Sequence, residues 1–165
     1  MKKTSIILAA ILVLTLFLGA CAKEPSVQES KTVEASVSDI AKAVIGTDSL
    51  KDMSIMNEAV QPGAEYFPGF GNYKITGYSE GRNFAPMIST IPFMGYIFRV
   101  EDPEKVEEFK TAIKENANMR WNICTEADTM ICESVKDVVL FVMLPSENMP
   151  DAVDQLTAAF KEAAK

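Results

Sequence analysis

Few side chains in this 165-residue sequence can carry catalytic chemistry, and histidine is absent. Without histidine there is no Ser-His-Asp or Cys-His pairing, no imidazole ligand for zinc and no general base that titrates near neutral pH. Residues 77–81 match the G-x-S-x-G pattern around Ser79. That pattern acts at a strand-turn-helix junction with a histidine partner, so we interpret it as a glycine-bounded turn after a strand. The sequence predicts no enzyme and no catalytic residue.

Thiols and thioethers are the remaining groups with distinctive chemistry. Cys124 and Cys132 lie eight residues apart, so residues 125–129 would have to fold back to join them in a disulfide. The alternative is that Cys132 alternates inward on a strand and packs as a small apolar side chain. Two thiolates without histidine are short of ligands for a metal, and the nine methionines are dispersed rather than clustered for copper. We expect no metal and no cofactor.

Cys21 ends an N-terminal segment that is typical of export signals. Two lysines precede an uncharged apolar run over residues 6–18, which is too short to span a bilayer. The run ends in LGAC at residues 18–21, which resembles the lipobox of bacterial lipoproteins, where diacylglycerol is attached to the cysteine before cleavage. We expect residues 1–20 to be a lipoprotein signal peptide. Cys21 would carry the acyl chains, palmitate among them, at the extracytoplasmic face of the cell membrane.

The charge of the exported part limits its partners. The whole chain has 16 basic and 23 acidic residues; removing residues 1–20 takes away two lysines and no acid, leaving 14 basic residues and a net charge of −9. Nucleic acids and anionic lipid surfaces are bound mainly through lysine and arginine, so neither is an expected partner of the folded part. Contact with the membrane is expected through the lipid alone.

The exported part divides into a polar tether and one domain. Residues 22–36 contain one proline and no aromatic side chain, which is typical of a flexible linker, so Cys21 and the tether occupy residues 21–36. Residues 37–165 are of a size that folds as one domain around one core.

Helical and strand periodicities alternate through that domain. Helices are predicted from Ser38 to about Gly46, after Asp102 and Pro103, and over 148–164. Strands are predicted over 73–79, 93–101, 130–136 and 138–144, the last being apolar on both faces and hence central. This pattern predicts an α+β fold: a mostly antiparallel sheet of about four strands, with the helices packed on one face. We expect one core that contains Phe109, Leu140 and Phe160.

Aromatic residues are concentrated between residues 62 and 96, among glycines and prolines. Tyr66, Phe70, Tyr73 and Phe84 are the candidates for contact with a ligand, because aromatic side chains in a long loop stack on sugars or hold peptides. The alternative is that they seal the core of a small domain, and that role is favoured because most of the few aromatic residues are needed there.

The stretch IPFMGYIFRVEDPEKVEEFKTAI, followed by MICESVKDVVLFVML and a closing amphipathic helix, resembles a family of small uncharacterised lipoproteins from Gram-positive, largely gut-dwelling bacteria. The resemblance covers residues 84–163 and implies fold and location, but no activity and no catalytic residue. The anaerobic habitat that it implies would keep the two thiols reduced. The expected function is a non-catalytic binding or interaction module for a protein, peptide or glycan; the alternative is an accessory or scaffold subunit of a membrane complex.

Overall fold

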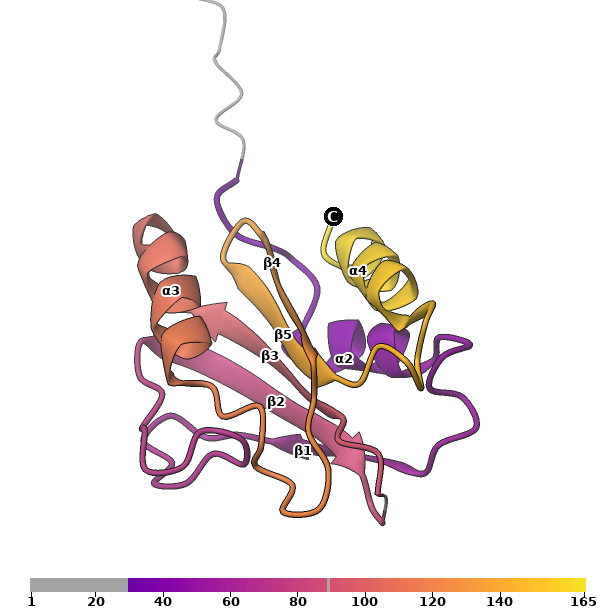
Figure 1. Ribbon diagram of the computed structural model, residues 1–165. Helices are drawn as coiled ribbons and strands as arrows, with labels where there is room; N and C mark the ends of the chain where they lie inside the picture. The colour runs from indigo at the N-terminus through magenta and orange to yellow at the C-terminus, as the bar shows by residue number, and fades with distance from the viewer. Residues whose placement is uncertain (1–29, 89) are drawn as a thin grey trace, which may run out of the picture.

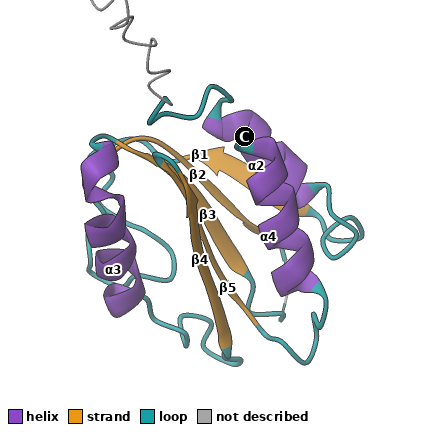
Figure 2. Ribbon diagram, turned by 90° about the horizontal axis from the view of Figure 1, so that it is seen from above, coloured by secondary structure: helices purple, strands orange, loops and turns teal. Residues whose placement is uncertain are grey.

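The computed structural model describes residues 30–88 and 90–165, which form a five-stranded antiparallel sheet between two layers of helix and loop (Figures 1 and 2). The strands lie in the order β1-β2-β3-β5-β4. Their bounds are β1 Ile55–Ala59, β2 Tyr78–Pro86, β3 Met94–Val100, β4 Thr129–Val135 and β5 Val138–Leu144. The helices are α2 Val37–Ile45, α3 Val106–Asn116 and α4 Ala152–Ala163, with a 3-10 turn, η1, at Pro103–Lys105.

Strand β5 is central because neither of its faces meets water. All seven of its residues are buried, and it pairs with β3 on one side and β4 on the other. Successive side chains point to opposite faces, so Leu140 belongs to one core and Phe141 to the other. The predicted central strand is confirmed.

The first face is covered by α2 and α4, which pack against each other and on the sheet. Helix α2 is capped by Ser36, whose hydroxyl accepts a hydrogen bond from the backbone N–H of Asp39 at 3.1 Å, and Gly46 follows its last residue. Phe84 reaches this core across Gly95 of the neighbouring strand. A Cβ at Gly95 would lie 2.2 Å from the ring, so glycine is what lets Phe84 lie on the sheet.

The second face is covered by α3 over β4 and β5, and by the loop that leads into β2. Phe67, Phe70 and Ile75 of that loop are fully buried against the sheet. Phe70 lies edge-on to Tyr96 at 5.6 Å between ring centroids, and Tyr96 stacks on Phe98 at 5.4 Å. The loop therefore takes the place of a second helix on this face.

The α+β class and the antiparallel sheet are confirmed, with five strands rather than about four. The helices, however, divide between the two faces, as Figure 2 shows, so the expectation that all would lie on one face is wrong. Phe109 consequently packs in the second core, whereas Leu140 and Phe160 pack in the first. Because β5 is apolar on both sides, its sequence does not say which face each helix takes.

Two segments of the sheet differ from expectation. The strand predicted over 73–79 begins only at Tyr78, and β1 was not predicted at all. The G-x-S-x-G segment is the start of β2, with a register shift between Tyr78 and Glu80, rather than a turn after a strand. Ser79 donates a hydrogen bond to the backbone oxygen of Arg99 at 3.4 Å, so it serves the sheet.

The chain enters the domain through a clamp of opposite charges. Asp137, in the β4–β5 turn, accepts a hydrogen bond from the N–H of Val33 at 2.7 Å and is paired with Arg99 at 2.8 Å. Arg99 in turn donates to the backbone oxygens of Val33 and Ala35, at 2.9 and 2.6 Å. Val33 is buried in the first core, so the predicted boundary after residue 36 lies too far along the chain.

The signal peptide, Cys21 and the first part of the tether fall within residues 1–29 and lie outside the described residues. In the part of the chain that the structure describes, no helix is long and apolar enough to cross a membrane.

Candidate functional site

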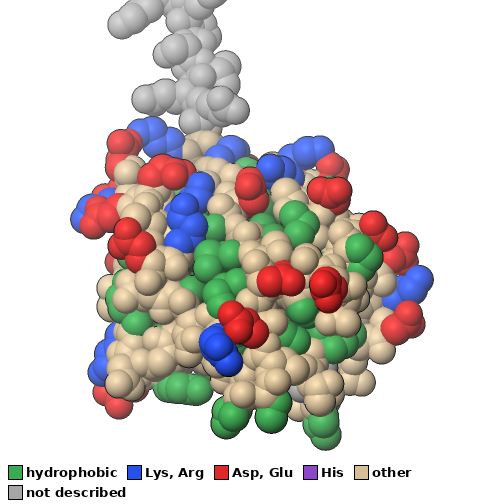
Figure 3. Space-filling view, viewed as in Figure 1, with side chains coloured by type: hydrophobic (Ala, Val, Ile, Leu, Met, Phe, Trp, Pro, Cys, Tyr) green, Lys and Arg blue, Asp and Glu red, His purple; other side chains and the backbone are tan. Residues whose placement is uncertain are grey.

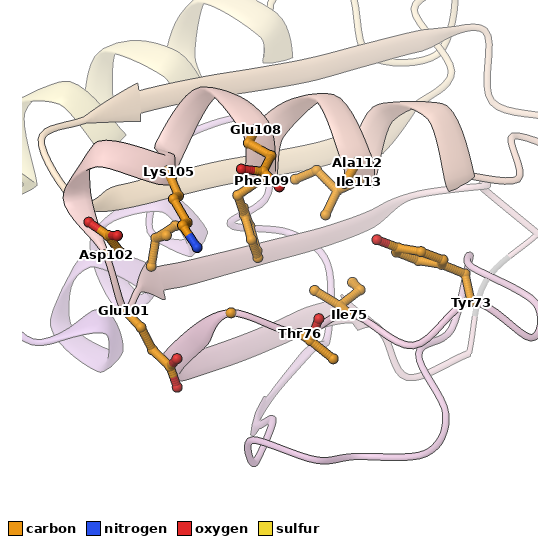
Figure 4. Close-up of a pocket in the computed structure, with 12 residues that line it drawn as sticks. Tyr73, Ile75, Thr76, Glu101, Asp102, Lys105, Glu108, Phe109, Ala112 and Ile113 are labelled. Carbon is orange, nitrogen blue, oxygen red and sulfur yellow. The ribbon is translucent and has the colours of Figure 1, made fainter.

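A groove runs between α3 and the loop segment that precedes β2 (Figure 4). Its volume is about 320 Å³ and it is open to solvent along one side. Residues from three places line it: the loop segment, the end of β3 with the turn that follows, and one side of α3. They are Tyr73, Ile75, Thr76, Gly77, Val100, Glu101, Asp102, Lys105, Glu108, Phe109, Ala112 and Ile113.

The floor of the groove is apolar because α3 turns its core-facing side toward it. Asp102 caps the start of η1 by accepting a hydrogen bond from the N–H of Glu104 at 3.0 Å, and Pro103 follows at the first helical position. From there the helical repeat brings Phe109 and Ile113 onto one side of α3. Ile75 meets them from the loop, and all three are buried in the second core.

The rim of the groove is polar and mostly acidic. Glu101, Asp102 and Glu108 contribute carboxylates, and Lys105 contributes the one ammonium group among the lining residues. None of these four side chains forms an ion pair within the described residues. Figure 4 shows Lys105 reaching down from η1 and the hydroxyl of Tyr73 pointing toward α3 from the loop. The groove therefore combines an apolar floor with polar side chains, of which Asp102 caps η1 and the others form no ion pair among the described residues.

On the loop side of the groove, three residues have backbone groups that no other described residue pairs with. Lys74 and Thr76 are exposed and Ile75 between them is buried, an alternation typical of extended chain. Among the described residues, the N–H and C=O groups of these three residues form no hydrogen bond, and pairing resumes at Gly77, whose oxygen accepts from the N–H of Glu101 at 3.0 Å. Gly77 has φ of 83°, which redirects the chain into β2.

The four aromatic residues singled out in the sequence are not brought together. Phe70 and Phe84 are buried in the cores of opposite faces, and Tyr66 is 69% exposed on the loop. Tyr73 alone of the four lines the groove. Phe70 and Phe84 thus seal the core. The sequence did not single out Ile75, Lys105 or Glu108, although the border between the apolar and charged sides of α3 is where such residues would be found.

The cysteines show no arrangement for catalysis. Both are free thiols; Cys124 is exposed in the loop before β4, and Cys132 lies on β4 with its Sγ 3.9 Å from the backbone oxygen of Lys110. Burial raises the pKa of the Cys132 thiol to about 11, which disfavours the reactive thiolate near neutral pH. No group of three or more Cys, Asp or Glu side chains able to hold a metal occurs in residues 30–88 and 90–165.

A second surface lies at the other end of the sheet, at the loops after β2 and before β4. Met87, Ile88 and Ile123 are 63, 97 and 96% exposed. Beside them is a hollow of about 390 Å³, lined by apolar side chains and Asn122 and by no charged residue. Figure 3 shows hydrophobic side chains along the lower edge of the molecule, away from the entering chain. We call Met87, Ile88 and Ile123, with this hollow, the distal apolar surface.

The chain matches no protein-family model, no curated protein and no solved structure.

Proposed function

We propose that this chain is a lipoprotein of the extracytoplasmic membrane face that acts as a non-catalytic binding module, with the groove beside α3 as its binding site. The groove is the observation that carries the proposal. Its volume is within the range of ligand sites, its floor is apolar, and the hydroxyl of Tyr73 and the charges of Lys105 and Glu108 converge on it. These groups can hold and orient a ligand, and nothing beside them resembles a catalytic pair.

The lipid anchor rests on the lipobox-like LGAC at residues 18–21, together with the resemblance to small Gram-positive lipoproteins. Within the described residues, the clamp at Val33 holds the segment that leads back toward Cys21 at one end of the sheet. Metabolic labelling with a radioactive fatty acid should mark the wild type and leave Cys21→Ser unmarked. Label that persists in the variant would contradict the anchor.

Binding at the groove is tested by filling it. Ala112 is half-buried and lines the groove, so Ala112→Trp should occupy the space without disturbing the core. Affinity capture from native membranes should retain a component on the wild type that is lost on Ala112→Trp. Lys114→Trp, on the same helix but outside the groove, is the matched control and should retain it. Equal capture by all three chains would argue against the groove as the site.

The distal apolar surface favours a second candidate, an accessory subunit that occupies a membrane complex. Exposed aliphatic side chains at an uncharged hollow are typical of contact with another protein. If this surface carries the function, Ile88→Asp with Ile123→Asp should remove the captured component while Ala112→Trp leaves it in place. The two candidates thus predict opposite results for the same pair of variants.

A further inference from the structure

We propose that the groove beside α3 binds an extended peptide that alternates apolar and basic residues, pairing its backbone with Lys74–Thr76. This inference rests on the proposed binding function and names the ligand class for the same site.

The unpaired backbone of Lys74–Thr76 indicates a peptide rather than another ligand. Three consecutive residues of alternating exposure offer N–H and C=O groups that form no hydrogen bond within the described residues. An added strand pairs with such groups irrespective of its sequence, and main-chain hydrogen bonds then provide much of the affinity. Three residues of extended chain span about 10 Å, which is enough to fix the position of a paired peptide of four or five residues.

The floor of the groove determines which side chains the peptide presents inward. Ile75, Phe109 and Ile113 underlie the groove and are nearly fully buried, and half-buried Ala112 leaves space beside them. Successive side chains of an extended peptide point to opposite sides, so every second residue meets this floor. Residues at those positions should be aliphatic.

The rim determines the charge of the residues between them. The carboxylates of Glu101, Asp102 and Glu108 outnumber the ammonium group of Lys105, although Asp102 also caps η1 and is attracted by the charge of Lys31. A lysine or arginine side chain that leaves the floor passes this acidic rim, whereas a glutamate there meets three like charges. The groove is therefore complementary to basic rather than acidic peptides.

A capped pentapeptide of alternating lysine and valine, with lysine at both ends, is the direct probe. Its two valines share one side, as the floor requires. Binding of the fluorescently labelled peptide to the full chain, purified in detergent, is measured by anisotropy. The wild type should bind it at least about tenfold more tightly than the same peptide with glutamate in place of lysine, because each rim pair contributes a factor of up to about five. Equal binding of the two peptides would overturn the proposal.

Backbone pairing is tested separately by N-methylation. Methylating the backbone nitrogens of both valines in one peptide, and of the three lysines in another, removes the donors on one edge of the strand at a time. One of the two peptides should lose at least about tenfold in affinity and the other should keep most of it, because only one edge faces Lys74–Thr76. Equal affinity of both for the wild type would exclude strand addition.

The charge of the rim is tested on the protein side with one matched pair. Glu108→Gln should weaken binding of the basic peptide about threefold to fivefold, in keeping with a partly exposed ion pair. Glu115→Gln removes an exposed carboxylate from the same helix outside the groove and should leave binding unchanged. Equal losses would show that only the overall charge acts, and would overturn the rim assignment.

Failure here is distinguishable from failure of the proposed function. If no peptide binds, but the membrane component is still lost on Ala112→Trp, the peptide inference is overturned and the groove remains a binding site for another ligand. If Ala112→Trp retains the component, the proposed binding function of the groove is wrong.

Discussion

Each face of the sheet buries an apolar core, and the two cores lie under different covers. On one face α2 and α4 pack on each other, and the core is largely aliphatic. On the other face α3 shares the cover with an irregular loop, and the core is rich in aromatic rings. A helix satisfies its own backbone, whereas a loop needs partners for its carbonyl groups. Tyrosines of the sheet supply them: Tyr78 donates to the oxygen of Gln61 and Tyr96 to that of Pro68, each at 2.7 Å.

The groove is a consequence of this difference. Two helices interlock side by side, but a loop held at a few tyrosine hydroxyls does not interdigitate with the helix beside it along its whole length. The space is left at the seam between the loop and α3. The candidate site is thus on the face that is covered partly by a loop, and not on the face that is covered by two helices.

The largest expected effects test whether the two cores are separate. Phe160 is fully buried in the first core, and we expect Phe160→Ala to lower the free energy of unfolding by about 3–5 kcal/mol. Phe109 is nearly fully buried in the second core, and Phe109→Ala should cost somewhat less because Phe109 borders the groove. Their combined cost in urea denaturation should be additive to within about 0.5 kcal/mol.

The matched comparison combines Phe109→Ala with Phe98→Ala. These two rings touch edge-on at 5.4 Å within the second core. The loss of unfolding free energy in the double variant should differ from the sum of the two single losses by about 0.5 kcal/mol or more. Strong coupling of Phe109 to Phe160 would instead mean that the sheet does not insulate its two faces.

The clamp at the edge of the first core should give the next largest effect. Asp137→Ala removes the carboxylate that pairs with Arg99 and leaves the N–H of Val33 without its acceptor, and it should cost about 3 kcal/mol of unfolding free energy, although Arg99 keeps its bonds to the oxygens of Val33 and Ala35. It should also free the entering chain, so that a glutamate-specific protease cuts after Glu34 under native conditions.

Glu80→Ala is the control for the clamp. Glu80 lies 3.8 Å from the same Arg99, but its side chain is 53% exposed. Glu80→Ala should change the free energy of unfolding by no more than about 0.5 kcal/mol. It should also leave Glu34 protected from the protease. Equal effects of the two substitutions would mean that the chain is not held by Asp137.

Removing one hydroxyl from the second face should loosen the loop alone. Tyr96→Phe leaves the oxygen of Pro68 without its partner and should cost about 1–3 kcal/mol. The amides of the loop should then exchange faster by hydrogen-exchange mass spectrometry, while those of α2 and α4 stay protected. Tyr66→Phe, on an exposed ring of the same loop, should change neither quantity. Faster exchange on both faces would break the contrast between the two covers.

The smallest effect concerns Cys132, a reporter of the α3 side. Burial raises the pKa of this thiol in the folded protein to about 11 from its ordinary value of 9.0. The unfolded chain therefore loses this proton at lower pH, and the protein loses stability as pH rises from about 9 to 11. At pH 8 iodoacetamide should label exposed Cys124 rapidly and Cys132 only after unfolding. Comparable rates in the folded protein would mean that α3 does not cover β4.

The sequence predicts those helices and strands whose signals all lie within their own residues and do not depend on a partner strand. Helix α3 follows its cap at Asp102 and Pro103, and β5 is a run of apolar residues that only a central strand accommodates. Strand β1 is different: Ile55–Ala59 is a half-exposed edge strand, Met53 and Met56 fall at helical spacing, and its register comes from β2. Strand β2 likewise begins where β3 offers a partner.

The groove could not be predicted for a similar reason. Tyr73 was a candidate because it is aromatic, and it does line the groove; Phe70 and Phe84 were candidates on the same ground and lie in opposite cores. Whether an aromatic side chain packs in a core or lines the groove depends on which face of the sheet its segment covers. That assignment also decides which side of α3 is left uncovered, so Lys105 and Glu108 could be recognised only in the fold.

The clamp at Val33 also sets how the domain bears mechanical load. A pull on the chain preceding Val33 passes the exposed ion pair of Lys31 with Glu104 and is then borne by Asp137 and Arg99, which hold the N–H and oxygen of Val33 and the oxygen of Ala35. Asp137 and Arg99 stand at the same end of the sheet, one beside β5 and the other on β3, which are paired strands. Tension is therefore divided between two neighbouring central strands, and the entering segment should peel away before any strand leaves the sheet.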